Sequence, residues 1–231
     1  IALHAEIAAT LAELDLSSAE AQRIARFELA RYAALALMMP YAGFLAAAQR
    51  ARYDIGILCA RFRVSFEQAA NRLTSLQRPG TAGIPFFFLE VDNAGNAVRR
   101  AGAQGYPQAR FGGRCPKLNI HATFAAPGQV FAECVEMLEG TGYLVVSRTL
   151  EGPIASFEER VRRTAILIGC ESSHADHIVY GGVATSRPPV PVGTSCRLCE
   201  RPGCLARAEP PITRPLGLDE MVAGLSVFDF Q

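Results

Sequence analysis

The chain has 231 residues, half of them hydrophobic, and a formal net charge of +1. A chain of this length can form one or two hydrophobic cores. Its near-zero net charge excludes overall electrostatic steering toward nucleic acid or acidic lipid. Seven cysteines, an odd number, argue against the disulfide framework of a secreted protein. The sequence has neither a signal peptide nor an apolar stretch long enough to span a membrane. We therefore expect a cytoplasmic protein. Because a helical pattern already includes Ile1, we also expect a fragment of a longer protein.

The first third of the sequence has the periodicity of helices. Ser17 or Ser18 is placed to cap a long helix that ends before Pro40, and Ser65 caps a later one. Five helices are predicted, over residues 2–14, from about 18 to 39, and over 42–52, 54–62 and 66–77. Residues 1–80 are therefore assigned to a helical domain.

Residues 60–73 (ARFRVSFEQAANRL) have the pattern of a helix-turn-helix. Such a pair can read DNA, in which case Gln68, Asn71 and Arg72 would face outward. More often the two helices simply pack in a core. The sequence favours this second interpretation.

A degraded peptidase motif lies in the second helix, at residues 27–31 (FELAR). Zinc peptidases use His-Glu-x-x-His on one helical face, with two imidazole ligands and the glutamate as general base. Phe27 and Arg31 stand at the two histidine positions, and Glu28 remains. Neither Phe nor Arg can bind zinc, so we expect a peptidase-like scaffold without peptidase activity.

After residue 80, the spacing of the apolar residues changes from the period of helices to that of strands. A hairpin is predicted from a strand over 85–92, a turn at 93–96 and a strand over 97–103. Three more strands are expected over 130–138, 142–152 and 162–170, with short helices over 116–126 and 172–180. Residues 81–231 therefore form a second domain, and the fold class is α+β, with an antiparallel GAF/PAS-like sensor sheet.

A cationic cluster surrounds two consecutive glycines in this second part. Gly112 and Gly113 allow the backbone to approach a ligand closely. The candidate ligand-binding cations around them are Arg110, Arg114, Lys117 and His121.

Cysteines are concentrated near the end of the chain. Cys196, Cys199 and Cys204 lie within nine residues, and Cys170 ends an apolar run upstream. Four thiolates can hold a metal centre. The turn at residues 202–203 would let Cys204 bind the same metal centre as Cys196 and Cys199. Structural zinc sites usually combine two close pairs, whereas iron–sulfur clusters tolerate uneven spacing. Spacing alone leaves both centres open.

The segments GGRCPKLNIHATFAAPG, GCESSHADHIVY and GTSCRLCERPGCLARAEPPI resemble the bacterial short-chain fatty acyl-CoA responsive transcriptional regulators, including the propionate/methylcitrate type. Residues 1–80 fit the family's ImmA/IrrE-like middle domain. The resemblance implies a regulator rather than an enzyme, binding a short-chain acyl-CoA, with propionyl-CoA expected. It also implies a homo-oligomer and DNA contact through a helix-turn-helix domain absent from this chain.

The resemblance further implies a 4Fe–4S cluster, with zinc as the alternative. Carried onto this chain, its ligands are Cys170, Cys196, Cys199 and Cys204, and Cys115 could replace Cys170.

An acyl-CoA ligand would need cations for its phosphates and an apolar pocket for its acyl end. Phe86 and Phe88 share one face of a strand and are candidates for that pocket. The alternative function is a metal-dependent or acyl-CoA-modifying enzyme. However, no Ser/His/Asp or Cys/His arrangement for acyl transfer can be recognised from the spacing of these residues in the sequence.

Overall fold

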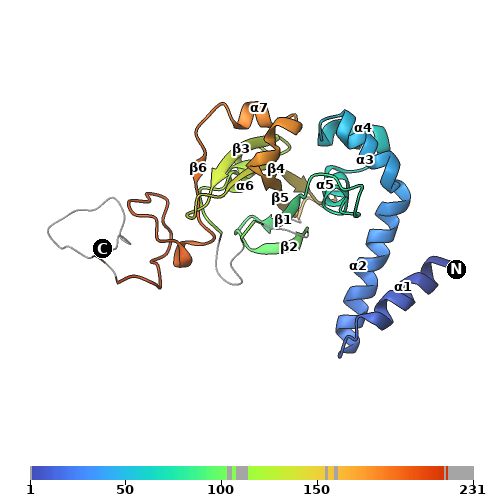
Figure 1. Cartoon of the computed structure of the whole chain (residues 1–231). Coiled ribbons are helices and arrows are strands. Elements are labelled where there is room, and N and C mark those ends of the chain that lie inside the picture. Colours follow the sequence, from blue (N-terminus) through green and yellow to red (C-terminus); the bar gives the residue numbers. More distant parts are fainter. Residues whose placement is uncertain are drawn as a thin grey trace.

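Five helices begin the chain, as the sequence predicts (Figure 1). The computed structural model describes residues 2–102, 106–107, 114–153, 156–158, 161–215 and 217. The helices are α1 (Ala2–Glu13), α2 (Ala19–Met38), α3 (Tyr41–Arg50), α4 (Ile55–Phe62) and α5 (Phe66–Thr74). Ser18 caps α2 by accepting a hydrogen bond from the N–H of Ala21. Pro40 precedes α3 and separates the two helices.

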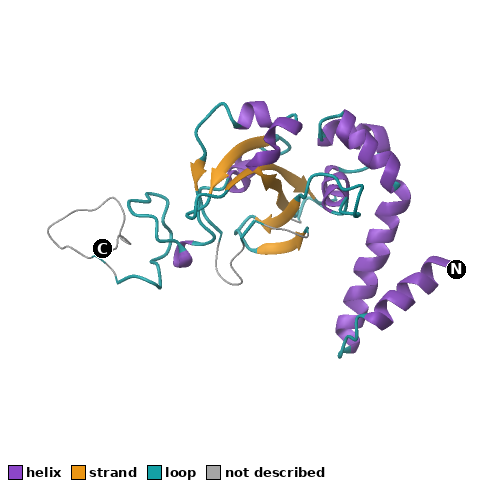
Figure 2. Cartoon of the chain, in the orientation of Figure 1, coloured by secondary structure: helices purple, strands orange, loops and turns teal. Residues whose placement is uncertain are grey.

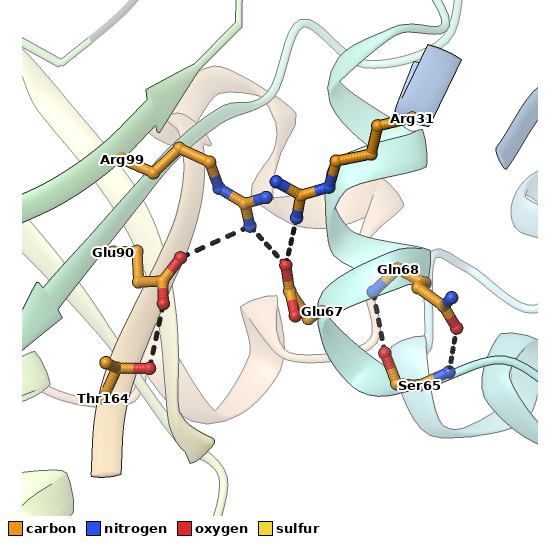
Figure 3. Close-up of polar contacts among 7 residues, drawn as sticks. All are labelled: Arg31, Ser65, Glu67, Gln68, Glu90, Arg99 and Thr164. Carbon is orange, nitrogen blue, oxygen red and sulfur yellow. Dashed lines mark hydrogen bonds and ion pairs between the residues drawn. The ribbon is translucent and has the colours of Figure 1, made fainter. Parts of the chain in front are cut away.

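The α4–α5 pair is part of the protein core. Ser65 and Gln68 form a reciprocal capping box at the start of α5 (Figure 3). Arg72 is 2% exposed, and its Nε donates to the backbone oxygen of Met39 at 3.0 Å. Because Gln68 closes the cap and Arg72 is buried, these side chains cannot read DNA. The interpretation of packed core helices is confirmed.

Six strands form one mixed sheet in the order β2-β1-β5-β4-β3-β6. They are β1 (Phe87–Asp92), β2 (Ala97–Ala101), β3 (Phe131–Glu136), β4 (Gly142–Glu151), β5 (Arg163–Glu171) and β6 (Val190–Pro191). The first five pair with one another in antiparallel fashion, as predicted. The short β6 runs parallel to β3 and was not predicted. The sheet is therefore mixed, and its kinship with GAF or PAS domains stays a prediction.

The two faces of the sheet are buried in two separate cores. Phe88, Val146 and Ile168 belong to a core shared with helices α3 to α5. Phe87 and Leu167 belong to a second core on the opposite face, which the loops and the short helix before β3 cover. This alternation follows from the two-residue period of strands. The helical part and the sheet are consequently packed around one common core.

Helices α1 and α2 project away from the sheet as an arm (Figure 1). Within α2 only Ala33 and Leu35 are buried, whereas Ile24 and Phe27 are 65% and 67% exposed. Among the described residues, no single helix is long and apolar enough to cross a membrane; the bent pair α2 and α3 passes that test on length and composition only.

Short elements complete the second half. They are α6 (Asn119–Ala122), η1 (Thr123–Ala125), η2 (Ser172–His177), α7 (Gly181–Ala184) and η3 (Cys196–Leu198). The helix expected over 116–126 is thus an α-turn followed by a 3₁₀ turn, and the one expected over 172–180 is a 3₁₀ helix. Beyond β6 the described chain is mainly loop (Figure 2).

Candidate functional site

The degraded peptidase helix faces the junction of helices and sheet. Phe27 and Glu28 are exposed on α2, and Arg31 points toward α5 (Figure 3). The Arg31 guanidinium donates to the Glu67 carboxylate. The residue at the second histidine position therefore makes an ion pair within the protein.

An ion network continues from Glu67 into the sheet (Figure 3). Arg99 on β2 donates to the same Glu67 oxygen at 2.6 Å and lies 3.4 Å from Glu90 on β1. Thr164 on β5 donates to the other Glu90 oxygen at 2.9 Å. The Arg99 guanidinium also lies over the Phe88 ring, 4.8 Å from its centroid. The network thus joins two helices to three strands.

Two grooves border this network. One has a volume of about 450 Å³, and four glutamates line it with Arg31, Arg99 and Arg162. The adjoining groove has a volume of about 360 Å³ and includes Tyr32 and Arg72. No local sequence pattern predicts this junction, because its charged residues come from segments far apart in the chain.

The predicted phosphate-binding residues are only partly described. Arg110, Gly112 and Gly113 lie outside the described residues. Arg114 is 6% exposed, and burial lowers its pKa, as does the charge of Arg100. Lys117 and His121 are half-buried.

His121 lies beside the β1–β2 turn. Its Cε1 is 3.4 Å from the position that a Cβ on Gly95 would occupy. Burial lowers the pKa of His121, and its Nε2 has no hydrogen-bond partner among the described residues. Lys117 precedes α6, so the two side chains do not share one helix face as the sequence had suggested.

Phe86 and Phe88 do share a face, as predicted, and both face the helices. They are 6% and 0% exposed. The cavity beside Phe86 has a volume of only about 10 Å³, room for one water molecule. Their assignment to an acyl pocket stays a prediction.

The cysteines fall into two groups on opposite faces of the sheet. Cys170 on β5 is 1% exposed in the helix-facing core. Burial raises its pKa to about 12, and nearby Cys134 contributes. Cys115 belongs to the opposite core. Burial raises the Cys115 pKa, and neighbouring Cys196 and Cys199 raise it further. The structure therefore groups Cys115, rather than Cys170, with the C-terminal thiols.

The loop that carries these thiols is closely packed. A Cβ on Gly193 would lie 2.7 Å from the Cys199 sulfur. Arg207 is buried and donates to the backbone oxygen of Cys199 at 3.0 Å and of Arg201 at 2.7 Å. Cys204 is half-buried in the same loop. Among the described residues, no group of three or more His, Cys, Asp or Glu side chains is close enough together to hold a metal ion.

Comparison with known families gives two matches that together cover nearly the whole chain. The profile of the IrrE N-terminal-like domain matches residues 1–74. The profile of the C-terminal domain of the short-chain fatty acyl coenzyme A regulators matches residues 75–228. This chain belongs to the short-chain fatty acyl-CoA regulator family. The resemblance seen in the sequence is confirmed.

Similar curated proteins are regulators within this family. A propionyl-CoA carboxylase regulator of Cereibacter sphaeroides is 42% identical over 222 residues, covering 94% of this chain and 48% of that protein. The HTH-type transcriptional regulators RamB and PrpR of Mycobacterium tuberculosis are 41% and 37% identical, each over 93% of this chain and 46% and 45% of their own lengths. The chain thus spans about half the length of these relatives.

A solved structure shows the same fold. A Mycobacterium tuberculosis transcriptional regulator superimposes with a TM-score of 0.92 at 36% identity, covering 97% of this chain and 69% of that one. The helical first part and the mixed sheet are therefore the architecture of a transcriptional regulator of this family.

Proposed function

We propose that this chain is the ligand-sensing part of a bacterial transcriptional regulator, and that its ligand is a short-chain acyl-CoA, with propionyl-CoA expected. The match of residues 75–228 to the acyl-CoA regulator family carries this proposal. The similarity to a propionyl-CoA carboxylase regulator supports the choice of acyl group. DNA contact would come from a helix-turn-helix domain outside this chain, and the regulator would act as a homo-oligomer.

Calorimetric titration with CoA, acetyl-CoA, propionyl-CoA and a long-chain acyl-CoA tests the proposal. Each methylene adds about 0.8 kcal/mol only while the pocket has room, so affinity should rise from acetyl to propionyl and fall for the long chain. A charge-assisted bond to a phosphate is worth about 1.5–3 kcal/mol. Lys117→Ala should therefore weaken CoA binding roughly 10- to 150-fold. Absence of binding by every CoA species would refute the proposal.

The enzyme alternative has a separate test. Without imidazoles at positions 27 and 31, the α2 helix cannot bind a peptidase zinc. Glu28→Ala should leave propionyl-CoA affinity unchanged, and the parent should neither cleave peptides in a chelator-sensitive way nor release free CoA. Either activity would favour the enzyme.

We also propose a cysteine-bound centre at Cys115, Cys196, Cys199 and Cys204, an iron–sulfur cluster with zinc as the alternative. Three observations support this donor set. Gly193 lies against both the Cys115 thiol and the Cys199 sulfur. Cys204 lies in the same C-terminal loop as Cys196 and Cys199, and Cys170 lies on the other face of the sheet. When bound, such a centre would cross-link the loop to the second core. Neutral thiols would release protons on binding it.

A further inference from the structure

Helix α2 is more apolar than its burial explains. Residues 29–38 (LARYAALALM) carry a single charge, that of Arg31. A helix that is apolar on all sides is normally buried, yet only Ala33 and Leu35 of α2 are buried. Figure 1 shows α2 projecting from the rest of the protein. The helix therefore has an apolar surface that the described part of the chain leaves exposed.

The exposed apolar residues of α2 form a regular stripe along the helix. Its members are Phe27, Ala30, Ala34 and Leu37, which we call the α2 seam. Phe27 is 67% exposed and Leu37 is 71% exposed. The spacings of three, four and three residues are those of the a and d positions of a coiled coil. Helices with this pattern pack against another helix, so the α2 seam has the form of a helix-binding surface.

The α2 seam points away from the covered side of the helix. Ala25 and Leu29 are partly buried. Each residue of a helix is rotated by about 100° from the one before it, so these two residues lie opposite Phe27. Arg31, one turn from Phe27, is already paired with Glu67. The seam is thus an uncharged surface that a partner can reach.

The seam is complementary to itself in an antiparallel helix pair, in which a positions face d positions. With a two-fold axis midway between residues 30 and 34, Phe27 of one copy faces Leu37 of the other. Ala30 likewise faces Ala34. The small alanines at the centre let the two helices approach closely, and the large side chains close both ends. Such a two-fold contact uses the same surface of both copies.

A parallel pair fits less well. It would bring Arg23, the d position one turn before the seam, against Arg23 of the other copy, and like charges repel. An antiparallel pair avoids this contact. It also lays the projecting half of each α2 on the half of the other α2 that is anchored in its core through Leu35. The two sheets would then lie at opposite ends of the pair.

We propose that the α2 seam is the interface of an antiparallel dimer of this chain. This dimer would be the homo-oligomer of the proposed function, on which the proposal rests, and it requires no bound ligand. The seam spans about three helical turns, which gives a contact at the low end of specific interface sizes. We therefore expect the dimer to dissociate when the protein is diluted through the micromolar range.

Two single substitutions, alone and mixed, test both the interface and its direction. In sedimentation equilibrium over a concentration series, Phe27→Glu and Leu37→Arg should each weaken dimerisation roughly tenfold or more, because each buries an unpaired charge. An equimolar mixture should dimerise more tightly than either variant alone, since the new glutamate of one copy faces the new arginine of the other. In a parallel pair these charges would not meet. The absence of any gain on mixing would overturn the antiparallel interface.

Ile212→Glu is the matched control. Ile212 is 64% exposed and belongs to the C-terminal loop, which Figure 1 shows at the end of the molecule remote from α2. This variant should dimerise as the parent does. A parent that stays monomeric at every concentration would overturn the proposal and leave the seam to another occupant. Dimerisation of Phe27→Glu as tight as that of the parent would also overturn it.

Calorimetry with propionyl-CoA separates the dimer from the ligand-sensing function. Phe27→Glu should bind propionyl-CoA as the parent does, because Phe27 is exposed and its replacement leaves the fold intact. A parent that binds propionyl-CoA as a monomer refutes the interface alone. A parent that dimerises through the seam but binds no CoA species refutes the acyl-CoA function alone.

Discussion

Removing the central guanidinium of the ion network should destabilise the protein measurably. Arg99→Met keeps an apolar side chain of similar length but deletes the guanidinium over the Phe88 ring, the 2.6 Å bond to Glu67 and the 3.4 Å ion pair with Glu90. The three charged side chains are 16%, 30% and 13% exposed, so water screens them only partly. Hydrogen bonds to charged groups contribute about 1.5–3 kcal/mol. Since Glu67 keeps Arg31 and Glu90 keeps Thr164, we expect a loss of about 2 kcal/mol.

Urea unfolding at neutral pH and thermal melting measure this loss. For a chain of this size, about 2 kcal/mol corresponds to a fall of roughly 4–8 °C in Tm. Arg163→Met is the matched control, because its pair with Glu151 is 39% and 54% exposed and should contribute less than about 1 kcal/mol. Equal losses for Arg99→Met and Arg163→Met would refute the view that the network stabilises the helix–sheet junction.

Three other predictions concern the cysteines, α7 and Glu133. Cys115→Ser should lose bound metal and sulfide in elemental analysis, whereas Cys170→Ser should retain them; the opposite result would restore Cys170 as the ligand. Gly181→Ala should cost about 3 kcal/mol or more in urea unfolding, because its Cβ would lie 2.0 Å from a backbone oxygen. Gly182→Ala, with nothing within 4 Å, should unfold like the parent. Burial raises the pKa of Glu133. Its folded pKa thus exceeds its unfolded pKa, and its ionisation destabilises the fold at neutral pH. Glu133→Gln should stabilise the protein at pH 7, and this gain should vanish below the unfolded pKa; a gain that persisted in acid would contradict it.

The helices and the antiparallel strands could be predicted from the sequence because their signals are local. Ser18 and Ser65 mark helix starts, and both act as caps in the structure. Strand alternation correctly placed Phe86 and Phe88 on one face. The two-residue β6 and the four-residue α7 were missed, since segments this short have no periodicity.

The site residues depended on long-range packing, which the sequence does not show. Alternation along β5 puts Cys170 on the face of Ile168, but nothing local says that helices cover that face. For the same reason, the sequence did not predict the pairing of Arg31 with Glu67, which lie 36 positions apart.

The projecting α2 has the geometry of a lever. Its last turns are anchored in the core through Leu35, and the ion pair at Arg31 forms a second support. The helix then extends beyond that support by the 12 residues back to Ala19, or about 18 Å at 1.5 Å per residue. A tilt of about 6° at the support would shift the free end by roughly 2 Å at that length. Loosening Arg31 from Glu67 would therefore convert a small rearrangement at the sheet into a larger displacement at the far end of the arm.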